Sequence, residues 1–163
     1  MSDLLFQLLK KKQMTMSAAE SCTGGLISKN MTDIAGSSDV FWGGFITYSN
    51  DAKKKLLAVD ECILDSYGAV SRETVIAMAE GAIGKSGTDC TVSVSGIAGP
   101  GGGSELKPVG TVWICAALSN GIMNVDKYLF QGNRNEVREK ATETAIMMVY
   151  HLICEYKLLT VNK

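Results

Sequence analysis

Residues 90–130 read CTVSVSGIAGPGGGSELKPVGTVWICAALSNGIMNVDKYLF, and this stretch decides the fold class. It begins with CTVSVS (90–95), a β-branched run that is typical of a strand. TVWICAAL (111–118) and MNVDKYLF (123–130) flank Asn120-Gly121, a dipeptide that favours a tight hairpin turn. The stretch therefore predicts three strands, of which the last two form a hairpin.

Outside this stretch, strands alternate with helices in the first half of the chain. Such alternation followed by a hairpin is typical of a mixed sheet between two helical layers. We therefore predict the α/β class, as a single three-layer α/β/α domain over residues 1–163. Hydrophobic spacing predicts helices over 3–13, from 25 to about 33, over 51–59, from 71 to about 83 and over 134–156, and strands over 15–19 and 43–48. The expected N-caps are Asp3 for the first helix, Asn50 or Asp51 for the third and Ser71 for the fourth.

The composition is that of a soluble globular protein. A chain of 163 residues has the size of one domain and buries roughly 70% of its unfolded surface. Hydrophobic residues make up 46% and charged residues 20%, and the formal net charge of −1 argues against a broad surface for nucleic acid. A local phosphate site is compatible with this charge, because one or two arginines and a glycine-rich loop suffice for it.

The same sequence sets expectations for partners and compartment. No apolar run approaches the ~20 residues that span a bilayer, and in MSDLLFQLLKKKQ (1–13) the lysines follow the apolar stretch, the reverse of a secretory signal. The cysteines are odd in number, scattered and without CxxC spacing, which favours free thiols over disulfides or a zinc site. We expect a cytoplasmic protein that binds no metal, no membrane and no nucleic acid.

Two glycine-bearing loops, ESCTGG (20–25) and SGIAGPGGGS (95–104), each follow a predicted strand. Because ligands of open α/β sheets bind at the carboxyl ends of strands, both loops are candidates for one shared crevice. Glycines let the backbone approach a ligand and turn N–H groups toward an anion, although a tight connection needs glycine as well. Ser21, between a strand and a helix N-terminus, suits a nucleophile and equally suits an ordinary N-cap.

The base that could activate such a serine is the next question. The only histidine, His151, lies in a mostly apolar terminal helix, which makes a Ser-His-Asp triad improbable. Lysine can serve instead if its pKa falls from ~10.4 toward ~7–8. YSNDAKKK (48–55) offers three consecutive lysines, of which a helix turns only one inward, but a solvated basic face has the same spacing. The residues permit a serine–lysine hydrolase without selecting it.

Several long blocks of the sequence strongly resemble the CinA C-terminal-domain family. They are AESCTGGLISKNMTDIAGSSDVFWGGFITYSNDAKKKLLAV, GAVSRETV, SVSGIAGPGGGSELKPVGTVW and FQGNRNEVREKA. The resemblance extends, in order, over almost the whole chain from about Ala18 to Arg138. Members of that family include nicotinamide-nucleotide amidases, which convert nicotinamide mononucleotide to nicotinate mononucleotide and ammonia in pyridine nucleotide salvage. The resemblance implies this activity without a cofactor, a small nucleotide as substrate, and a homodimer.

The resemblance also implies roles for individual residues. It places the nucleophile at Ser21 in AESCTGG and the lysine base at Lys53 in YSNDAK. Tyr48 opens the second pattern and would lie in the site. Ser38, the second serine of AGSS, would bind or polarise near the reacting group. Ser95 stands where many relatives have threonine and keeps the hydroxyl.

For the substrate, the resemblance implies that Arg134 pairs with the phosphate, with Arg138 as the alternative. Gly101 is a departure, because relatives often have a carboxylate or another residue there, and we expect it to affect loop stiffness more than chemistry. The remaining expected substrate-binding positions lie in the two glycine-bearing loops: Thr23, Gly24, Gly25, Gly96, Gly99, Gly101 and Gly102.

Three alternatives stay open at this point. The chain could be a catalytically idle nucleotide-binding or partner module of the same fold. It could be a different hydrolase, although pyrophosphate cleavage usually recruits Mg²⁺ through clustered carboxylates and the sequence has no such cluster. It could also be an interaction protein linked to competence or DNA damage, which the near-neutral charge does not directly support.

Overall fold

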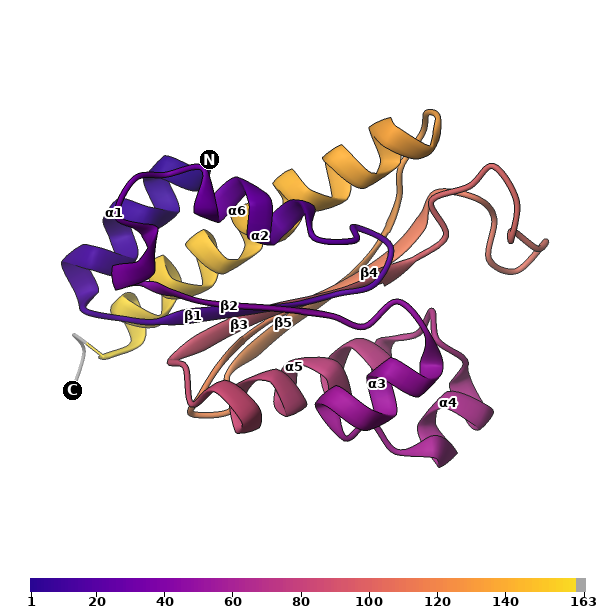
Figure 1. Cartoon of the computed structure of the whole chain (residues 1–163), viewed down its shortest axis with the longest axis horizontal. Helices are drawn as coiled ribbons and strands as arrows, with labels where there is room; N and C mark the ends of the chain where they lie inside the picture. Colours follow the sequence, from indigo (N-terminus) through magenta and orange to yellow (C-terminus); the bar gives the residue numbers. More distant parts are fainter. Residues whose placement is uncertain (161–163) are drawn as a thin grey trace.

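A computed structural model describes residues 1–160 and shows a sheet between two layers of helices (Figure 1). Residues 161–163, the end of the predicted domain, lie outside the described residues. The elements in chain order are α1 (Ser2–Lys12), β1 (Met16–Glu20), α2 (Leu26–Thr32), the 3₁₀ turn η1 (Ser37–Asp39), β2 (Phe41–Ile46), α3 (Asn50–Leu57), α4 (Glu61–Tyr67), α5 (Arg72–Ser86), β3 (Cys90–Gly96), β4 (Thr111–Leu118), β5 (Met123–Leu129) and α6 (Arg134–Thr160).

The sheet is mixed, with the strand order β2-β1-β3-β4-β5. β1 runs parallel to both β2 and β3, whereas β4 is antiparallel to β3 and β5. α1, α2 and α6 cover one face and α3, α4 and α5 the other (Figure 1), so every residue of β1 is buried. The predicted three-layer α/β/α fold with a mixed sheet is confirmed.

The hairpin of β4 and β5 has the predicted Asn120-Gly121 turn. Gly121 adopts φ 89°, a left-handed conformation that glycine reaches without strain, and the Asn120 side chain accepts a hydrogen bond from Ile122 N at 3.1 Å. The strands continue in register, with Ala117 opposite Met123. A local dipeptide signal therefore sets the register of the β4–β5 pair.

Two helix starts differ from the sequence prediction. α1 begins at Ser2 with Met1 as N-cap, so Asp3 lies inside the first turn. Ser49, and neither of the two residues after it, caps α3: its backbone is extended and its hydroxyl accepts from Ala52 N at 3.0 Å. Ser71 caps α5 as predicted, accepting from Thr74 N at 3.2 Å.

Two further differences concern the middle of the chain. β2 begins two residues before the predicted strand, at Phe41, and its register against β1 shifts near Met16. α4 was not predicted; it follows Asp60, whose carboxylate accepts from Cys62 N at 2.8 Å. The short α4 ends at Tyr67, and residues 68–71 connect it to α5.

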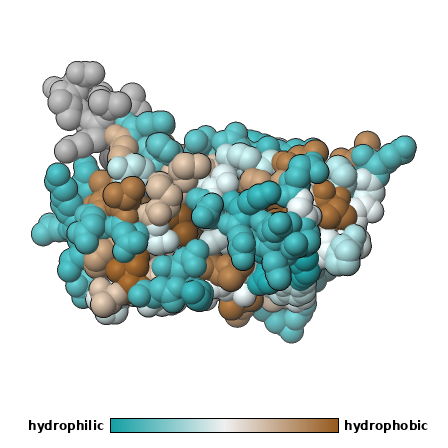
Figure 2. All heavy atoms as spheres, turned by 90° about the horizontal axis from the view of Figure 1, so that it is seen from above, coloured by the Kyte–Doolittle hydropathy of each residue, from teal (hydrophilic) through white to brown (hydrophobic). Residues whose placement is uncertain are grey.

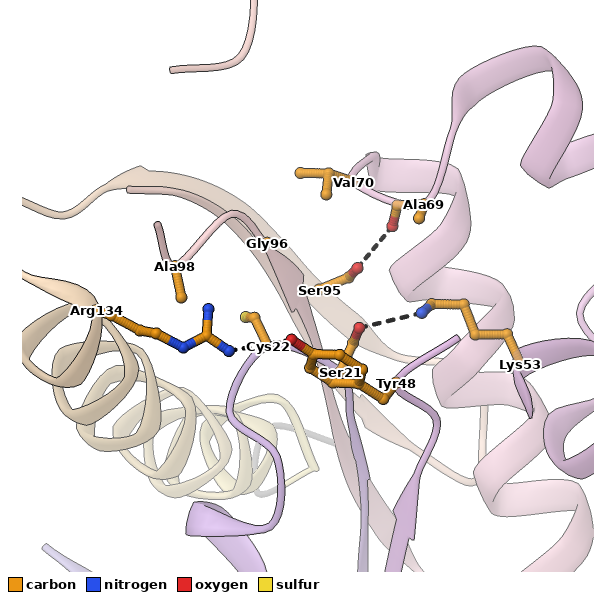
Figure 3. Close-up of a pocket in the computed structure, with 10 residues that line it drawn as sticks. All are labelled: Ser21, Cys22, Tyr48, Lys53, Ala69, Val70, Ser95, Gly96, Ala98 and Arg134. Carbon is orange, nitrogen blue, oxygen red and sulfur yellow. Dashed lines mark hydrogen bonds between the residues drawn. The ribbon is translucent and has the colours of Figure 1, made fainter. Parts of the chain in front are cut away.

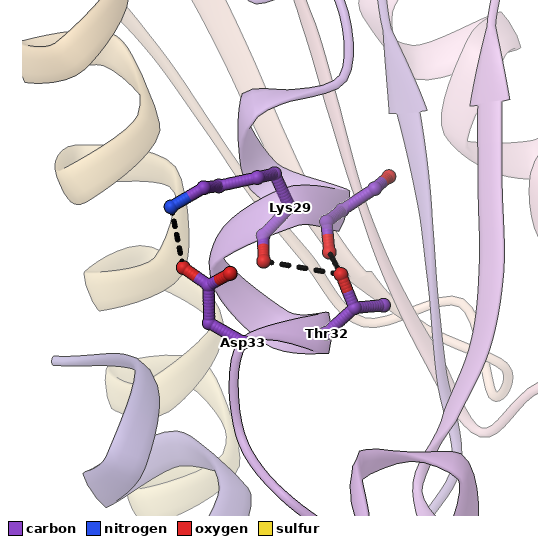
Figure 4. A network of polar contacts seen from close by, with 4 residues as sticks. Lys29, Thr32 and Asp33 are labelled. Atoms are coloured by element: carbon purple, nitrogen blue, oxygen red, sulfur yellow. Dashed lines mark hydrogen bonds and ion pairs between the residues drawn. The ribbon is translucent and has the colours of Figure 1, made fainter.

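α2 is a short helix with polar contacts at its C-terminal end (Figure 4). The Thr32 hydroxyl donates to the Ser28 carbonyl at 2.8 Å, and Lys29 pairs with Asp33 at 2.5 Å. This ion pair is solvent-exposed and contributes ~0.3–0.5 kcal/mol at most. The stronger restraint on α2 lies at its other end.

The outer face over α1, α2 and α6 carries hydrophilic residues with separate hydrophobic patches between them (Figure 2). The apolar core lies beneath, where α1, α2 and α6 pack on the sheet through Leu5, Leu9, Ile27, Val137 and Ile146. None of the helices in the described part of the chain has an apolar stretch long enough to cross a bilayer.

Candidate active site

The carboxyl ends of the parallel strands open into a cavity of about 250 Å³ (Figure 3). Ser21 directly follows β1, Ser95 lies near the end of β3, and Lys53 comes from α3 after β2. The two glycine-bearing loops thus meet in one crevice, as predicted. The lining residues are Ser21, Cys22, Tyr48, Lys53, Ala69, Val70, Ser95, Gly96, Ala98 and Arg134.

Lys53 is the one lysine of its run that points inward. Its side chain is 1% exposed, because Leu57, one turn later on the same helical face, is anchored in the core. Lys54 and Lys55 point outward and pair with Glu61 and Asp51. The expectation that α3 turns a single lysine inward is confirmed.

The Lys53 amine lies beside the Ser21 hydroxyl. Its Nζ donates to Ser21 Oγ at 3.1 Å and to the Thr47 carbonyl at 2.9 Å. Burial disfavours the ammonium form and lowers the pKa of Lys53 to about 8. In the neutral form the Nζ lone pair faces Ser21 and is able to accept its proton, so the geometry suits a serine activated by lysine.

Glu20 fixes the turn that carries Ser21. Its fully buried carboxylate accepts from Gly25 N at 2.9 Å, from Ile27 N at 3.1 Å and from Ser28 N at 2.9 Å. The Ser28 hydroxyl donates to the same carboxylate at 2.7 Å. Because Gly25, the N-cap of α2, has no side chain, Glu20 satisfies the helix start in its place.

This cap limits which backbone donors can serve the chemistry. The N–H groups at the start of α2 are occupied by Glu20 and are not free for an oxyanion. Among the described residues, the backbone N–H groups of Cys22 and Thr23 donate no hydrogen bond to a backbone carbonyl. Arg138 braces the same turn from behind, donating to the carbonyls of Cys22 at 3.2 Å and Thr23 at 2.9 Å.

Arg134 and Arg138 occupy different environments. Arg134 lines the cavity, where Nη1 donates to the Gly99 carbonyl at 2.8 Å and Nη2 to the Tyr48 hydroxyl at 3.0 Å. Both acceptors are neutral, so the Arg134 charge has no counterion among the described residues. Of the two arginines, only Arg134 faces a ligand space.

The loop after β3 contributes part of what was expected of it. Ser95 is 1% exposed and its hydroxyl donates to the Ala69 carbonyl at 2.6 Å (Figure 3). Gly96 lines the same cavity, and Gly99 lines a neighbouring one of about 600 Å³ that shares Ala98 and Arg134 with the first. Gly101 and Gly102 are exposed and line neither of these two cavities.

The structure corrects the expectation for Ser38. It is exposed on η1 ahead of β2, whereas Ser21 follows the end of β1. The hydrogen bond from Met16 N to the Val40 carbonyl, 2.7 Å, pins η1 to the amino ends of the strands. Because a whole strand separates the two serines, the fold of one chain does not bring Ser38 to the cavity.

Three further positions lie beside the cavity without lining it. Thr23 is buried under the Arg138 guanidinium, and a side chain at Gly24 would approach Arg138 Nη2 to 3.2 Å. Gly25 has φ 99° and faces the Ile46 side chain. These residues shape the Ser21 turn from behind, so a direct contact of their side chains or Cα atoms with the ligand is not supported.

Sequence reasoning assigned no role to Glu20, Ala69 or Val70. The one available signal for Glu20 was general: a helix N-terminus favours a nearby carboxylate, and Glu20 precedes the predicted helix start. Cys22 lies next to Ser21, but burial raises the pKa of its thiol to about 12, so the thiol stays protonated. Within the described residues, no group of three or more His, Cys, Asp or Glu side chains could hold a metal ion.

A mixed five-stranded sheet with a buried serine–lysine pair at its strand ends defines an α/β domain with a candidate amide- or ester-cleaving site. The chain belongs to the CinA C-terminal domain family, whose sequence model matches residues 1–153. The resemblance drawn from the sequence blocks is thereby confirmed.

Individual relatives agree with this assignment. The chain is 47% identical over 150 residues to nicotinamide-nucleotide amidohydrolase PncC of Escherichia coli (strain K12), covering 92% of this chain and 91% of that protein. It is 52% identical over 144 residues to a CinA-like protein of Leptospira biflexa, but spans about a third, 34%, of that longer protein. The crystal structure of competence/damage inducible protein CihA from Agrobacterium tumefaciens superposes with a TM-score of 0.90 at 42% identity, covering 93% of this chain and 94% of that one.

Proposed function

We propose that this protein hydrolyses the carboxamide of nicotinamide mononucleotide, giving nicotinate mononucleotide and ammonia. The observation that carries the proposal is the buried Lys53 amine at 3.1 Å from the Ser21 hydroxyl, in a cavity that Arg134 borders. The near full-length similarity to an amidohydrolase of nicotinamide nucleotides supports the substrate. The salvage of pyridine nucleotides is the process such a reaction serves.

The reaction begins when neutral Lys53 accepts the proton of Ser21 and Ser21 Oγ bonds to the carboxamide carbon. The π electrons of the carbonyl move onto its oxygen. We assign this oxyanion to the backbone N–H groups of Cys22 and Thr23, which donate to no carbonyl and lie on the turn that Glu20 and Arg138 brace. One such donor contributes about 10²–10³ in turnover.

The intermediate then breaks its C–N bond, and the electron pair leaves with the nitrogen. The Lys53 ammonium returns its proton to that nitrogen, so ammonia departs and an acyl ester remains on Ser21. Water attacks the ester carbon while Lys53 accepts the water proton and then passes it to Ser21 Oγ. The cycle restores neutral Lys53 and releases a carboxylic acid, which gives its proton to ammonia or water and becomes the carboxylate product.

Arg134 and Tyr48 bind the nucleotide in this scheme. The Arg134 guanidinium now bonds to two neutral oxygens and would exchange them for a phosphate, a stronger and charge-assisted partner. Tyr48 is 62% exposed and its hydroxyl bonds to Arg134, which supports a role at the substrate and not as a proton relay for Lys53. Ser95 and Gly96 line the same cavity.

The direct test is ammonia release from nicotinamide mononucleotide by the purified protein. Ser21→Ala should abolish it, whereas Ser119→Ala, at the exposed hairpin turn, should leave it unchanged. The scheme uses no metal or organic cofactor, so release should continue in EDTA. Binding of the mononucleotide without ammonia release would instead favour a catalytically idle module, and no binding at all would favour an interaction protein.

We further propose that the protein is a cytoplasmic homodimer that does not bind nucleic acid. Light scattering measures the mass of the assembly, and its comparison with and without DNA tests both the dimer and the absence of DNA binding.

A further inference from the structure

Tyr67, the last residue of α4, and the three residues after it form one wall of the cavity, which Ala69 and Val70 line. The carbonyl oxygens of residues 67–70 accept no backbone hydrogen bond from the described residues, so they depend on other partners. The Lys107 ammonium donates to two of them, the carbonyl of Tyr67 at 3.1 Å and the carbonyl of Val70 at 2.8 Å. One side chain thus holds both ends of the segment.

The two carbonyls between these ends are also taken by side chains. The Gly68 carbonyl accepts from the hydroxyls of Ser71 at 2.9 Å and Thr74 at 2.8 Å. The Ala69 carbonyl accepts from Ser95, which itself lines the cavity (Figure 3). Four consecutive carbonyls are therefore fixed by side chains, and the wall keeps its position only while these donors hold it.

Lys107 reaches the wall from the glycine-rich loop between β3 and β4. A turn presents it, in which Ser104 N donates to the Lys107 carbonyl at 2.9 Å and Lys107 N donates to Ser104 Oγ at 3.1 Å. Gly68, in the middle of this wall, adopts φ 78°, a left-handed conformation that glycine reaches without strain. The same loop follows Ser95 and Gly96 at the end of β3, so Lys107 connects this loop to the wall.

We propose that Lys107 is a positioning residue, which fixes the 67–70 wall and thereby sets how tightly the cavity grips its substrate; this rests on the proposed function. Tyr67 is exposed and Val70 half-buried, so both carbonyls can be hydrated when the lysine is lost. Substitution of Lys107 should therefore leave the fold stable but make residues 67–70 more mobile. The expected signature is weaker substrate binding without a matching loss of stability.

The experiment compares Lys107→Met with Lys127→Met. Lys107 and Lys127 carry the same charge and line one surface pocket, next to Tyr67 and Val70. Among the described residues, the Lys127 side chain forms no ion pair, and it is exposed. We expect Lys107→Met to raise KM for nicotinamide mononucleotide about tenfold with kcat changed less than about threefold, the pattern of lost uniform binding. Lys107→Arg, which keeps two donors, should restore most of KM, and Lys127→Met should match the wild type.

Hydrogen exchange gives a readout that does not need turnover. In Lys107→Met the amides of residues 67–71 should exchange about tenfold faster or more, with unchanged exchange in β1 and β3. Equal effects of Lys107→Met and Lys127→Met, or no change in KM and exchange in Lys107→Met, would overturn the proposal. A wild-type protein without amidase activity would contradict the proposed function, and the exchange comparison would still decide whether Lys107 holds the wall.

Discussion

Lys53 is buried without a carboxylate beside it: among the described residues, no acidic group pairs with its amine. A charged lysine in such a place is costly, because the ammonium loses hydration that two neutral oxygens only partly replace. The same cost lowers its pKa to about 8 and makes the amine a usable base near neutral pH. Burial of Lys53 therefore lowers the stability of the fold and at the same time makes its amine a better base for catalysis.

Lys53→Met should separate these demands. We expect amide hydrolysis to fall by about 10²–10⁴, the usual contribution of a general base. At pH 7 the variant should be more stable than the wild type by on the order of 1–2 kcal/mol, since water in the cavity screens part of the burial cost. Ammonia assays and urea unfolding measure both, with Lys54→Met as the exposed control; a less stable Lys53→Met would contradict the argument.

The pH dependence follows from the same lowered pKa. Lys53 acts as a base only when neutral, so kcat/KM should fall about tenfold per pH unit below about 8 and level off above it. The stability of the wild type should also depend on pH. The pKa of Lys53 is 10.5 in the unfolded chain and about 8 in the folded protein, so the folded protein loses the proton first as the pH rises. The free energy of unfolding should therefore increase between pH 8 and pH 10.5 and stay constant below pH 8. A flat rate profile from pH 6 to 8.5 would exclude Lys53 as the base.

Spacing alone left the functional residues undecided, and the fold explains why. Ser21 looked as much like a cap as a nucleophile, but the cap of α2 is supplied by Glu20, which leaves the Ser21 hydroxyl for Lys53. Which of the consecutive lysines turns inward depends on the anchoring of Leu57, a tertiary contact. The family resemblance indicated both residues. It also indicated Ser38, which lies on η1 at the amino end of β2, opposite to the strand ends that form the cavity.

At the level of elements, the Ser21 turn depends on α2, a helix too short to be stable alone. Glu20→Gln should destabilise the protein by about 1–3 kcal/mol, because an amide cannot accept from all the donors that the carboxylate satisfies. Turnover should fall together with stability, because Ser21 and the backbone N–H groups of Cys22 and Thr23 belong to the same turn. Thermal unfolding and ammonia release check this.

The matched control for Glu20→Gln lies at the other end of α2. Asp33→Asn removes the exposed ion pair with Lys29 and should cost less than about 0.5 kcal/mol, with no change in turnover (Figure 4). Equal effects of the two substitutions would show that helix stability in general, and not the cap by Glu20, controls the turn.

Element types were readable from the sequence, whereas several boundaries were not. The Asn120-Gly121 hairpin and the Ser71 cap are local signals and were predicted correctly. β2 was misplaced because its register shifts against β1, which no local pattern reveals. α4 was missed since its seven residues contribute a single buried residue, Leu64, and show no extended periodicity.

At the scale of the whole molecule, the site exists only because parallel strands deliver distant residues to one edge of the sheet. Ser21, Lys53, Ser95 and Arg134 come from four different elements or loops (Figure 3). The sequence could predict that ESCTGG and SGIAGPGGGS share this edge, because both follow strands. It could not predict the wall at residues 67–70, which is placed by its contacts with Lys107 and Ser95.

Ligand binding should therefore stabilise the whole domain, since the ligand would join these elements. In the Ser21→Ala background, which prevents turnover, nicotinamide mononucleotide at 100 times its Kd adds about 2.7 kcal/mol. For a chain of this size the shift in Tm is roughly 5–10 °C. Arg134→Met should remove most of the shift by deleting the phosphate partner, whereas Lys140→Met, an exposed cation on the same helix, should not. Because the shift depends on binding alone, its presence without ammonia release in the wild type would assign the site to a sensor and not to an enzyme.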